Sequence, residues 1–322
     1  MNFNFIKATL KKQARYINIV KRDYEAFAFN LWFSWLKCYV LYGATPSDWF
    51  HNRMYALSSL GRRDIITRRK MLKLDRILNP KKYADIFNHK ELFNKVYSDF
   101  VHRDWLFTGK ASVEDIEAFV LKYKRIVVKP VDLSSGRGIH LFDVNKDNLN
   151  ILLDEIAGQQ YLLEEVVRNH PDLESLNPAS CQTIRVYSTV TQSGEPKILA
   201  TLLRVGGGDS ICDNFHAKGV VYPIDMNTGL VCGYGKDILL NEYARHPSTD
   251  MIMLGFSIPR WEEAKAFILQ AIAKNKDARF VAWDLAITSN GFEMIEGNYV
   301  PHCGLMQIFD WRGKYGMMKQ YL

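Results

Sequence analysis

The sequence of 322 residues predicts an α+β protein whose first 80 residues form a basic helical region. From residue 125 onward, short apolar runs bounded by Gly, Ser and Asn alternate with segments of helical periodicity, which is typical of mixed sheet and helix. Hydrophobic residues make up 48% of the chain and charged residues 24%, which fits a globular protein and excludes a disordered one. A chain of this length can bury a large core, so we expect two or three subdomains.

Positive charge is concentrated at the N-terminus. Residues 1–80 contain 15 Lys/Arg and 5 Asp/Glu, a balance of +10, whereas the remainder contains 27 and 30, a balance of −3. A basic lobe indicates an anionic partner, such as a substrate, a polymer, a phospholipid surface or nucleic acid. No recognised nucleic-acid motif accompanies the charge, so nucleic acid is the least favoured partner. Two basic runs, at 62–63 and 68–70, are interpreted either as a solvated helix face or as a grip on an anion.

The block from Phe27 to Leu41 is rich in aromatic and aliphatic residues. It is shorter than the roughly 20 apolar residues that span a bilayer and contains Lys37, so it is not a transmembrane helix. It also lies too far from the N-terminus, and lacks the cleavage context, for a signal peptide. We expect a buried helix; interfacial contact with a membrane is the alternative, because basic residues flank an aromatic face.

The cysteines predict a reducing compartment. The chain has five cysteines with no Cys-x-x-Cys spacing, which favours reduced thiols and a cytoplasmic setting. Cys303, next to His302, is either a nucleophile or a buried structural cysteine. The structural interpretation is favoured because cysteines of that kind are commoner.

The most informative chemistry lies in a predicted hairpin near the C-terminus. Two strand-like runs, at 282–286 and 294–298, flank a tight turn at Ser289–Gly291. Strand alternation places Asp284, Glu296 and Asn298 at the rim of one sheet face. Two carboxylates and an amide oxygen form a hard-oxygen set suited to Mg²⁺. A surface hairpin with ordinary polar residues is the alternative.

A glycine-rich loop between two short apolar runs forms a second candidate site. The run at 125–130 carries Lys129 and leads into Asp132–Gly138, which precedes the run at 139–144. Backbone N–H groups of such a loop can cover phosphates, and a lysine adds a point charge. The loop lacks the Gly-Lys-Ser/Thr of a Walker sequence. A generic glycine hairpin is the alternative.

An acidic strand is the third piece. The apolar run at 161–167 is interrupted by Glu164 and Glu165. Adjacent carboxylates in a buried strand require partners. An adenine amino group and ribose hydroxyls are suitable partners, and an exposed strand end is the alternative.

The remaining pattern predicts further helices and hairpins. Helices are expected at 112–124, opened by a capping sequence at Ser112, at 145–157 and at 259–274. Hairpins are expected for 183–191 with 197–205, and for 219–225 with 230–234.

Taken in this order, the lysine strand, glycine-rich loop, acidic strand and final Asp…Glu-x-Asn hairpin resemble the ATP-grasp superfamily over roughly residues 80 to 322. Four further segments look like its sugar-transfer-associated group: Asn169–Leu173, Gln182–Val186, Asp213–Gly219 and Ile224–Gly229. The resemblance implies an ATP-grasp fold, in which two α+β subdomains clasp ATP. The expected divisions are a basic helical region at 1–80, a flap subdomain at 81–167 and a C-terminal subdomain with the metal site at 168–322.

The resemblance also implies roles for individual residues. Lys90 resembles the family's first nucleotide-binding lysine, and Lys129 resembles the second. Lys95 is a second candidate for the first role, and an ordinary solvated lysine is the alternative interpretation of Lys90. The implied nucleotide-binding set is Lys90, Lys129, Ser135, Gly136, Gly138, Glu164, Glu165, Val167 and Asn214. The implied catalytic set is Arg185, Arg204, His216 and Lys218. Asp284, Glu296 and Asn298 would hold Mg²⁺.

The chain departs from the family pattern at three points. Lys218-Gly219 stands where many relatives have Gly-Gly. Ala282 stands where D-alanine–D-alanine ligases carry an arginine, so an arginine for the tetrahedral intermediate must come from elsewhere, with Arg185 or Arg204 as the candidates. The basic helical region replaces the usual Rossmann-like N-terminal domain.

The implied function is that of an ATP-dependent, Mg²⁺-requiring carboxylate–amine ligase acting through an acyl phosphate, in modification of a cell-surface polysaccharide or its precursor. A phosphotransferase using the same ATP site is the alternative, and a regulatory ATP-binding module is a third hypothesis. Expected partners are ATP, an anionic carboxylate-bearing substrate, sugar- or polymer-linked, and an amine. The expected location is cytoplasmic, with peripheral contact at the inner membrane face through the N-terminal region.

Overall fold

The structure is a computed structural model that describes residues 3–23, 27–131, 138–145, 148–208, 210, 213–215 and 219–322. The chain divides into two compact units. Unit 1 comprises Met1–Pro80 together with Val300–Leu322, and unit 2 comprises Lys81–Tyr299. The predicted α+β class is confirmed, and a helical N-terminal region precedes the sheets as expected.

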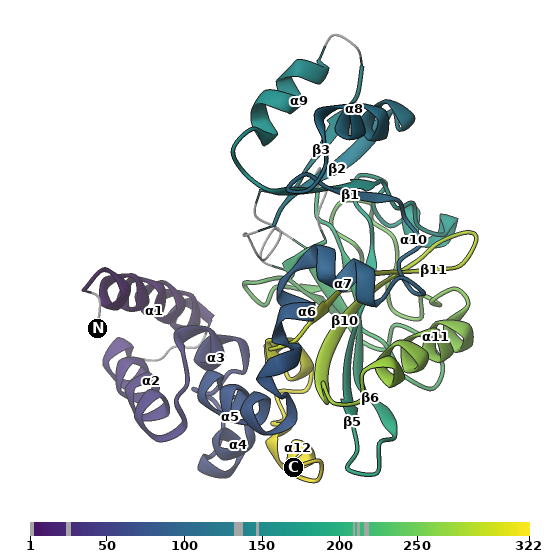
Figure 1. Cartoon of the computed structure of the whole chain (residues 1–322). Helices are drawn as coiled ribbons and strands as arrows, with labels where there is room; N and C mark the ends of the chain where they lie inside the picture. Colours follow the sequence, from purple (N-terminus) through teal and green to yellow (C-terminus); the bar gives the residue numbers. More distant parts are fainter. Residues whose placement is uncertain are drawn as a thin grey trace. The chain divides into compact units, whose positions relative to one another are not determined.

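Unit 1 is helical in the part that the structure describes. Its elements are α1 (Phe3–Asp23), α2 (Ala28–Tyr42), α3 (Pro46–His51), α4 (Ser59–Asp64), α5 (Arg68–Leu78), the 3-10 helix η3 (Cys303–Met306) and α12 (Tyr315–Lys319). Helices α1 and α2 lie side by side (Figure 1) and both contact α3. Tyr16 of α1 stacks on Phe50 of α3, with ring centroids 4.2 Å apart, so apolar packing joins the helices.

The C-terminal segment belongs to the same unit. The side-chain oxygen of Gln307 accepts a hydrogen bond from the Ile66 N–H at 2.8 Å, and its amide nitrogen donates to Asn52 at 3.3 Å. The N–H of Gly316 donates to the carboxylate of Asp64 at 2.6 Å. Residues 300–322 therefore complete unit 1. The subdivision of the remaining chain at residue 167 stays a prediction.

Cys303 lies in this unit, fully enclosed, and burial raises the pKa of its thiol far above the ordinary value. A thiol that stays protonated is a poor nucleophile, which supports the structural interpretation of this cysteine.

Two side chains of the predicted basic runs form hydrogen bonds to backbone carbonyls within unit 1. Arg62 donates from Nε to the Met54 carbonyl at 2.6 Å, and Arg69 donates from Nη1 to the Val40 carbonyl at 3.3 Å. Val40 lies in the last turn of α2, where carbonyls lack intrahelical partners and an arginine side chain can satisfy them, and Met54 lies in the turn that follows α3. Each of these two guanidinium groups therefore binds a backbone carbonyl of unit 1, and the anion grip stays a prediction.

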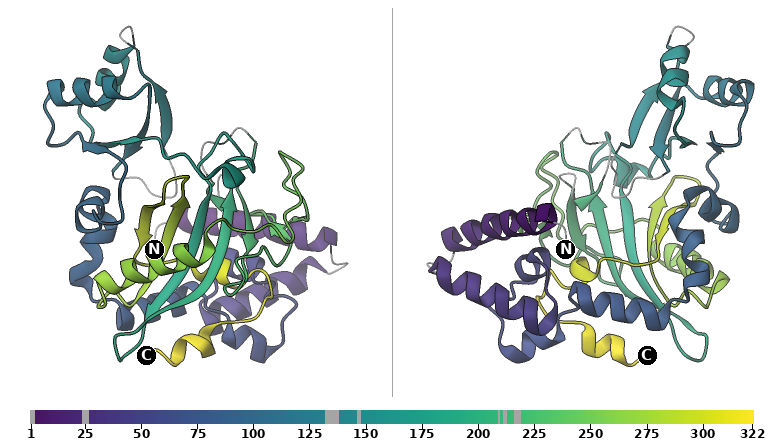
Figure 2. Two further views of the ribbon diagram at one scale, coloured as in Figure 1. Left: turned by 90° about the vertical axis from the view of Figure 1, so that its right-hand side faces the viewer. Right: turned by 60° about the vertical axis from the view of Figure 1, so that its left-hand side comes forward.

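Unit 2 contains two antiparallel sheets. Its helices are η1 (Lys81–Tyr83), α6 (Ala84–Asn88), α7 (Lys90–Val96), α8 (Val113–Lys122), α9 (Leu149–Ile156), α10 (Pro171–Glu174) and α11 (Trp261–Lys274). Its strands are β1 (Trp105–Phe107), β2 (Arg125–Pro130), β3 (His140–Asp143), β4 (Tyr161–Glu165), β5 (Thr183–Val190), β6 (Pro196–Val205), β7 (Val220–Pro223), β8 (Gly235–Lys236), β9 (Glu242–Tyr243), β10 (Phe280–Ile287) and β11 (Phe292–Asn298). The strand orders are β1-β4-β2-β3 and β11-β10-β5-β6-β7-β8-β9. Figure 2 shows the strands from two further sides.

The four-stranded sheet packs against α8 and α9. Ile116 and Val120 of α8 and Leu152 of α9 join Val128 and Leu163 of the sheet in one apolar cluster. The predicted capping sequence is confirmed, because the Ser112 hydroxyl accepts from the backbone of residue 115 and begins α8 there. Helix α9 begins four residues later than predicted, at Leu149.

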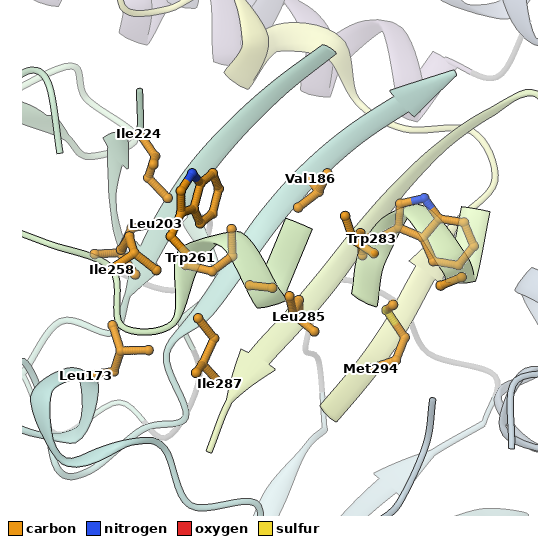
Figure 3. Close-up of a cluster of buried hydrophobic side chains, with 14 of the residues drawn as sticks. Leu173, Val186, Leu203, Ile224, Ile258, Trp261, Trp283, Leu285, Ile287 and Met294 are labelled. Carbon is orange, nitrogen blue, oxygen red and sulfur yellow. The ribbon is translucent and has the colours of Figure 1, made fainter. Parts of the chain in front are cut away.

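The seven-stranded sheet supplies the frame of the candidate site. The two predicted hairpins at 183–205 and 282–298 are confirmed as β5–β6 and β10–β11. Figure 3 shows the core face of this sheet, where Trp283, Leu285 and Ile287 of β10 point toward the cluster that includes Trp261 of α11. Strand alternation therefore turns Asp284 to the opposite face.

The later strands are less regular than predicted. Of the predicted hairpin at 219–234, the first strand is present as β7. The second strand, predicted at 230–234, contributes only the isolated bridge between Val231 and Ile224.

Candidate active site

A row of charged residues crosses three neighbouring strands on the face opposite the core. Asp284 of β10 is register-paired with Glu296 of β11 and with Arg185 of β5. Side chains of directly paired antiparallel residues point to the same face, so the three polar groups meet. The register with β11 shifts after Asp284, where Ile295 is the extra residue of a β-bulge, so that Glu296 lies opposite Asp284 while Met294 lies opposite Leu285 in the core.

The Asp284 carboxylate is buried and held by two arginines. Arg185 donates from Nε to Oδ1 at 2.5 Å and from Nη2 to Oδ2 at 3.0 Å. Arg204 of β6 places Nη2 3.1 Å from the same Oδ2. The first contact is a bidentate pair, the geometry in which guanidinium binds carboxylate best. The site thus holds two guanidinium groups at one carboxylate.

Arg204 extends this network to a second buried aspartate. Its Nη2 lies 3.1 Å from Asp213 Oδ1, and its Nε donates to the Thr183 hydroxyl at 2.9 Å. That hydroxyl in turn donates to Asp213. Neither Thr183 nor Asp213 was predicted as a site residue, although each lies within two residues of one that was.

The ionisation of the three carboxyl groups follows from this arrangement. Burial alone would raise the pKa of Asp284, but the charges of Arg185 and Arg204 outweigh it and hold the pKa below its ordinary value. The pKa of Glu296 is raised by burial and by the charge of Asp284, to which it hydrogen-bonds. Burial likewise raises the pKa of Asp213 despite Arg204. Two facing carboxyl groups with pKa values pushed apart favour either a shared proton or a cation between them.

The donor set fits Mg²⁺. Asn298 Nδ2 donates to Glu296 Oε1 at 3.2 Å, so the amide, Glu296 and Asp284 form one group of oxygen-bearing side chains. Hard oxygen ligands of this kind suit Mg²⁺. Among the described residues, no group of three or more His, Cys, Asp and Glu could hold a metal ion. The predicted set contains only two carboxylates, and its third ligand is an amide, so that finding does not bear on it.

A second charged cluster surrounds Glu164 on β4. One oxygen of this buried carboxylate lies 2.8 Å from Arg103 Nη2, and the other pairs with Lys129 of β2. Arg103 also contacts Glu293 of β11, with Nη1 2.5 Å from Oε1. The structure therefore brings Lys129 and Glu164 together as an ion pair, and each oxygen of Glu164 has a cationic partner.

Arg103 and Glu293 were not predicted. Both side chains are almost completely buried, at 3% and 5% exposure, so their charges must be compensated internally. A strand-by-strand search for acids adjacent to apolar residues could have found Glu293. No local pattern marks Arg103, which lies in the irregular segment before β1.

The two predicted nucleotide lysines lie at the same end of β2. Lys90, the first residue of α7, donates from Nζ to the Pro130 carbonyl at 3.1 Å, directly after Lys129 in sequence. Lys95, the fallback, is exposed. Glu165 accepts from the Asp104 N–H at 3.1 Å, and Val167 lies just beyond β4.

Part of the predicted site falls outside the described residues: Ser135, Gly136, His216 and Lys218. Gly138 is described and has a positive φ of 72°, the backbone conformation that favours glycine. The Gly219 N–H donates to the Asn214 carbonyl at 3.1 Å. A Cβ at Gly219 would lie 2.4 Å from the Asp213 carbonyl oxygen, so only glycine fits at position 219.

The model of the sugar-transfer associated ATP-grasp family matches residues 69–320. The chain belongs to this family. The resemblance predicted from its motifs is therefore confirmed, and the match includes both charged clusters. A search of the curated proteins found no match.

Solved structures of ATP-grasp proteins are similar to the chain at low identity. The ligase PsnB complexed with a minimal precursor is 14% identical, with a TM-score of 0.41, over 72% of this chain and 60% of that protein. D-Alanine–D-alanine ligase from Helicobacter pylori is 11% identical, with a TM-score of 0.47, over 74% and 61%. An ADP complex of N5-carboxyaminoimidazole ribonucleotide synthetase is 11% identical, with a TM-score of 0.45, over 73% and 52%. The chain thus spans about three fifths or less of the length of these proteins.

Proposed function

We propose that the protein is an ATP-dependent carboxylate–amine ligase that works through an acyl phosphate. The observation that carries this proposal is the row Arg185–Asp284–Glu296, in which Arg185 and Asp284 are buried, with Arg204 bound to the same aspartate. Such a row supplies anionic oxygens for a metal and guanidinium groups for phosphoryl oxygens on one face. The family membership supports the same assignment.

The proposed reaction has two steps. A substrate carboxylate oxygen attacks the γ-phosphorus of ATP, the bond from that phosphorus to the β–γ bridging oxygen breaks, and ADP leaves. An amine nitrogen then attacks the acyl carbon of the acyl phosphate, inorganic phosphate leaves with the C–O bond electrons, and the nitrogen loses a proton. The products are an amide, ADP and phosphate.

The chain's own charges supply most of the stabilisation in this scheme. Lys129 and Lys90 contribute positive charge for the ATP phosphates, and Arg185 and Arg204 do so for the transferred phosphoryl group and the tetrahedral intermediate. Preorganised charges in a buried site stabilise developing negative charge without reorganisation. Asp284, Glu296 and Asn298 would hold Mg²⁺, which when bound neutralises phosphate charge and polarises the phosphoryl group.

Arg204 is the candidate to replace the arginine that is absent at position 282. The residue two positions before Asp284 has no charge, but Arg204 reaches the same carboxylate from β6 at 3.1 Å. We propose that Arg204 takes the part of the missing arginine in the second step.

The substrate proposal follows from charge. We propose that the carboxylate substrate belongs to a cell-surface polysaccharide or its precursor, and that the enzyme acts in the cytoplasm, at the inner membrane face. The excess of +10 over residues 1–80 favours an anionic acceptor.

The test is incubation of the full chain with ATP, Mg²⁺ and pooled sugar acids and amino acids, followed by mass spectrometry. We expect ADP, phosphate and a product whose mass equals acid plus amine minus water. A product heavier by one phosphoryl group, with no free phosphate, would instead establish a phosphotransferase. ATP binding without turnover of any pool would favour a regulatory module.

A further inference from the structure

Helix α2 has two apolar faces, and only one of them is buried. Leu31, Trp35 and Cys38 face the interior of unit 1. Phe29, Phe33, Leu36 and Val40 recur at intervals of three or four residues, so they form one stripe on the helix surface. The expectation of a buried helix therefore holds for one face only.

The second stripe is unusually exposed for its composition. Phe29 is 79% exposed, Phe33 62%, Leu36 51% and Val40 61%. Phe27, just before the helix, is 79% exposed and Leu41 52%. Contiguous apolar residues on a surface generally mark an interaction site.

The charge around this stripe is almost entirely positive. Residues 3–42, which contain α1 and α2, hold seven Lys/Arg and two Asp/Glu. Lys7, Lys11 and Lys37 are exposed. Helix α1, which lies beside α2 (Figure 1), has no acidic residue before its last position. Long basic side chains can keep their charge at a polar surface while their stems lie along an apolar one.

We infer that the outer face of α2, with the lysines of α1, is a docking surface for an anionic lipid bilayer. The exposed aromatic and aliphatic stripe matches the acyl boundary of the bilayer, and the exposed lysines of the two neighbouring helices match its anionic headgroups. Among the described residues no helix has the length and apolar content to cross a membrane, so the helix would lie in the plane of the interface. A second copy of the chain is less favoured, because two such faces would bring like charges together.

Arg62 and Arg69 take no part in this surface, since their guanidinium groups bind backbone carbonyls. The inference does not depend on the ligase proposal, because it involves unit 1 alone.

The test is flotation of the full chain with vesicles of phosphatidylcholine alone and of phosphatidylcholine mixed with phosphatidylglycerol. We expect binding to the mixed vesicles and much weaker binding to the neutral ones. Raising NaCl from about 0.1 M to 1 M, which shortens the screening length from roughly 10 Å to 3 Å, should release much of the protein.

Two variants separate the apolar and charged contributions. Phe29→Gln combined with Phe33→Gln and Val40→Gln should reduce vesicle binding more than about tenfold for each side chain removed. Lys7→Gln with Lys11→Gln and Lys37→Gln should reduce binding to the mixed vesicles by on the order of a hundredfold, because each basic residue near an anionic surface contributes a factor of about five. Glutamine is a good helix former, so thermal unfolding should stay unchanged in both.

Matched controls remove comparable side chains from unit 2. Ile151→Gln removes an exposed apolar residue of α9, and Lys110→Gln with Lys124→Gln and Lys276→Gln removes three exposed lysines. Both controls should bind vesicles like the parent. Failure of the parent to float, or equal flotation of the stripe variant, would overturn the inference. So would a parent dimer that the stripe variant converts to a monomer without any vesicle binding.

ATP binding is measured on the same samples. A parent protein that binds vesicles but not ATP would contradict the proposed function and leave the docking surface standing. A parent protein that binds ATP but no vesicles would overturn the docking surface, and with it the proposed location at the membrane face, and would leave the proposed ATP-dependent reaction standing.

Discussion

The guanidinium of Arg185 forms a two-point ion pair with the carboxylate of Asp284, with Nε–Oδ1 and Nη2–Oδ2 distances of 2.5 and 3.0 Å. The two residues are directly opposite each other on β5 and β10, so the sheet register itself sets the contact. Because Asp284 is also a proposed metal ligand, the arginine holds the carboxylate ionised and oriented before any ligand arrives. Its two-point geometry, more than its charge, should matter for catalysis.

Arg185→Lys tests this directly. Lysine keeps the charge but cannot form the fork, so we expect kcat to fall by about 10²-fold or more, while KM for ATP changes little. Steady-state ADP release measures both. Arg245→Lys is the control, since Arg245 also faces an aspartate, Asp250 at 3.2 Å, but on an exposed loop. An equal decrease of kcat in Arg185→Lys and Arg245→Lys would contradict the special role of Arg185.

ATP affinity should depend on Lys129. This side chain is only 14% exposed and lies beside Glu164 at the end of β2 that also receives Lys90. Lys129→Ala should weaken ATP binding by about 1–3 kcal/mol, the range for hydrogen bonds to charged groups. Isothermal titration calorimetry gives the value. Lys124→Ala, at an exposed position next to the other end of β2, should bind ATP normally. A folded Lys129→Ala protein with unchanged affinity would remove the lysine from the nucleotide site.

Several parts of the fold and site were predictable because their signals are local. The β10–β11 hairpin follows from two alternating runs around a polar turn, and that alternation is enough to place Asp284, Glu296 and Asn298 on one face. The capping sequence at Ser112 is equally local. Each of these predictions uses residues fewer than about 20 positions apart.

Contacts set by tertiary packing could not be predicted in this way. Arg103 pairs with Glu164, 61 residues away, and with Glu293, 190 residues away, and it lies in a segment without regular structure. Arg69 looks like any exposed basic residue in sequence, yet it binds the end of α2, 29 residues earlier. The exposed stripe on α2 could not be distinguished from a buried one, because composition is the same for both.

Magnesium binding should require Glu296. Its carboxyl faces Asp284, and burial and that charge raise its pKa, so in the metal-free protein the two groups are costly neighbours. Glu296→Gln should abolish Mg²⁺-dependent turnover and leave the metal-free protein equally or more stable. Thermal unfolding in the presence of ADP should show that Mg²⁺ raises the free energy of unfolding of the parent, by about 2.7 kcal/mol at a ligand concentration 100 times Kd. Mg²⁺ should not raise the free energy of unfolding of the variant.

Glu262→Gln, an exposed acid on α11, serves as its control and should keep both turnover and the Mg²⁺ effect. Retained Mg²⁺ stabilisation in Glu296→Gln would show that the hairpin is structural only.

The cluster around Glu164 should give unit 2 a characteristic acid sensitivity. Burial alone would raise the pKa of Glu164, but the charges of Arg103 and Lys129 outweigh it and lower the pKa from 4.5 to about 2. A carboxyl whose pKa is lower in the folded than in the unfolded chain stabilises the fold at pH values above the unfolded pKa, and that contribution disappears as the pH falls through the folded one. The contribution should therefore be complete above about pH 5 and decline toward pH 2. A shift of this size corresponds to on the order of 3 kcal/mol.

Urea unfolding of the parent and of Glu164→Gln at several pH values between about 7 and 3 measures this contribution. Glutamine cannot ionise and leaves Arg103 and Lys129 without their shared anion, so the variant should be less stable at neutral pH. The difference in stability should be constant above about pH 5 and should shrink as the pH falls from there to about 3. Glu174→Gln, at the end of the short helix α10, controls for general acid effects and should follow the parent at every pH. A stability difference between parent and Glu164→Gln that is constant from pH 7 to 3 would mean that this carboxyl is not held ionised by its two cations.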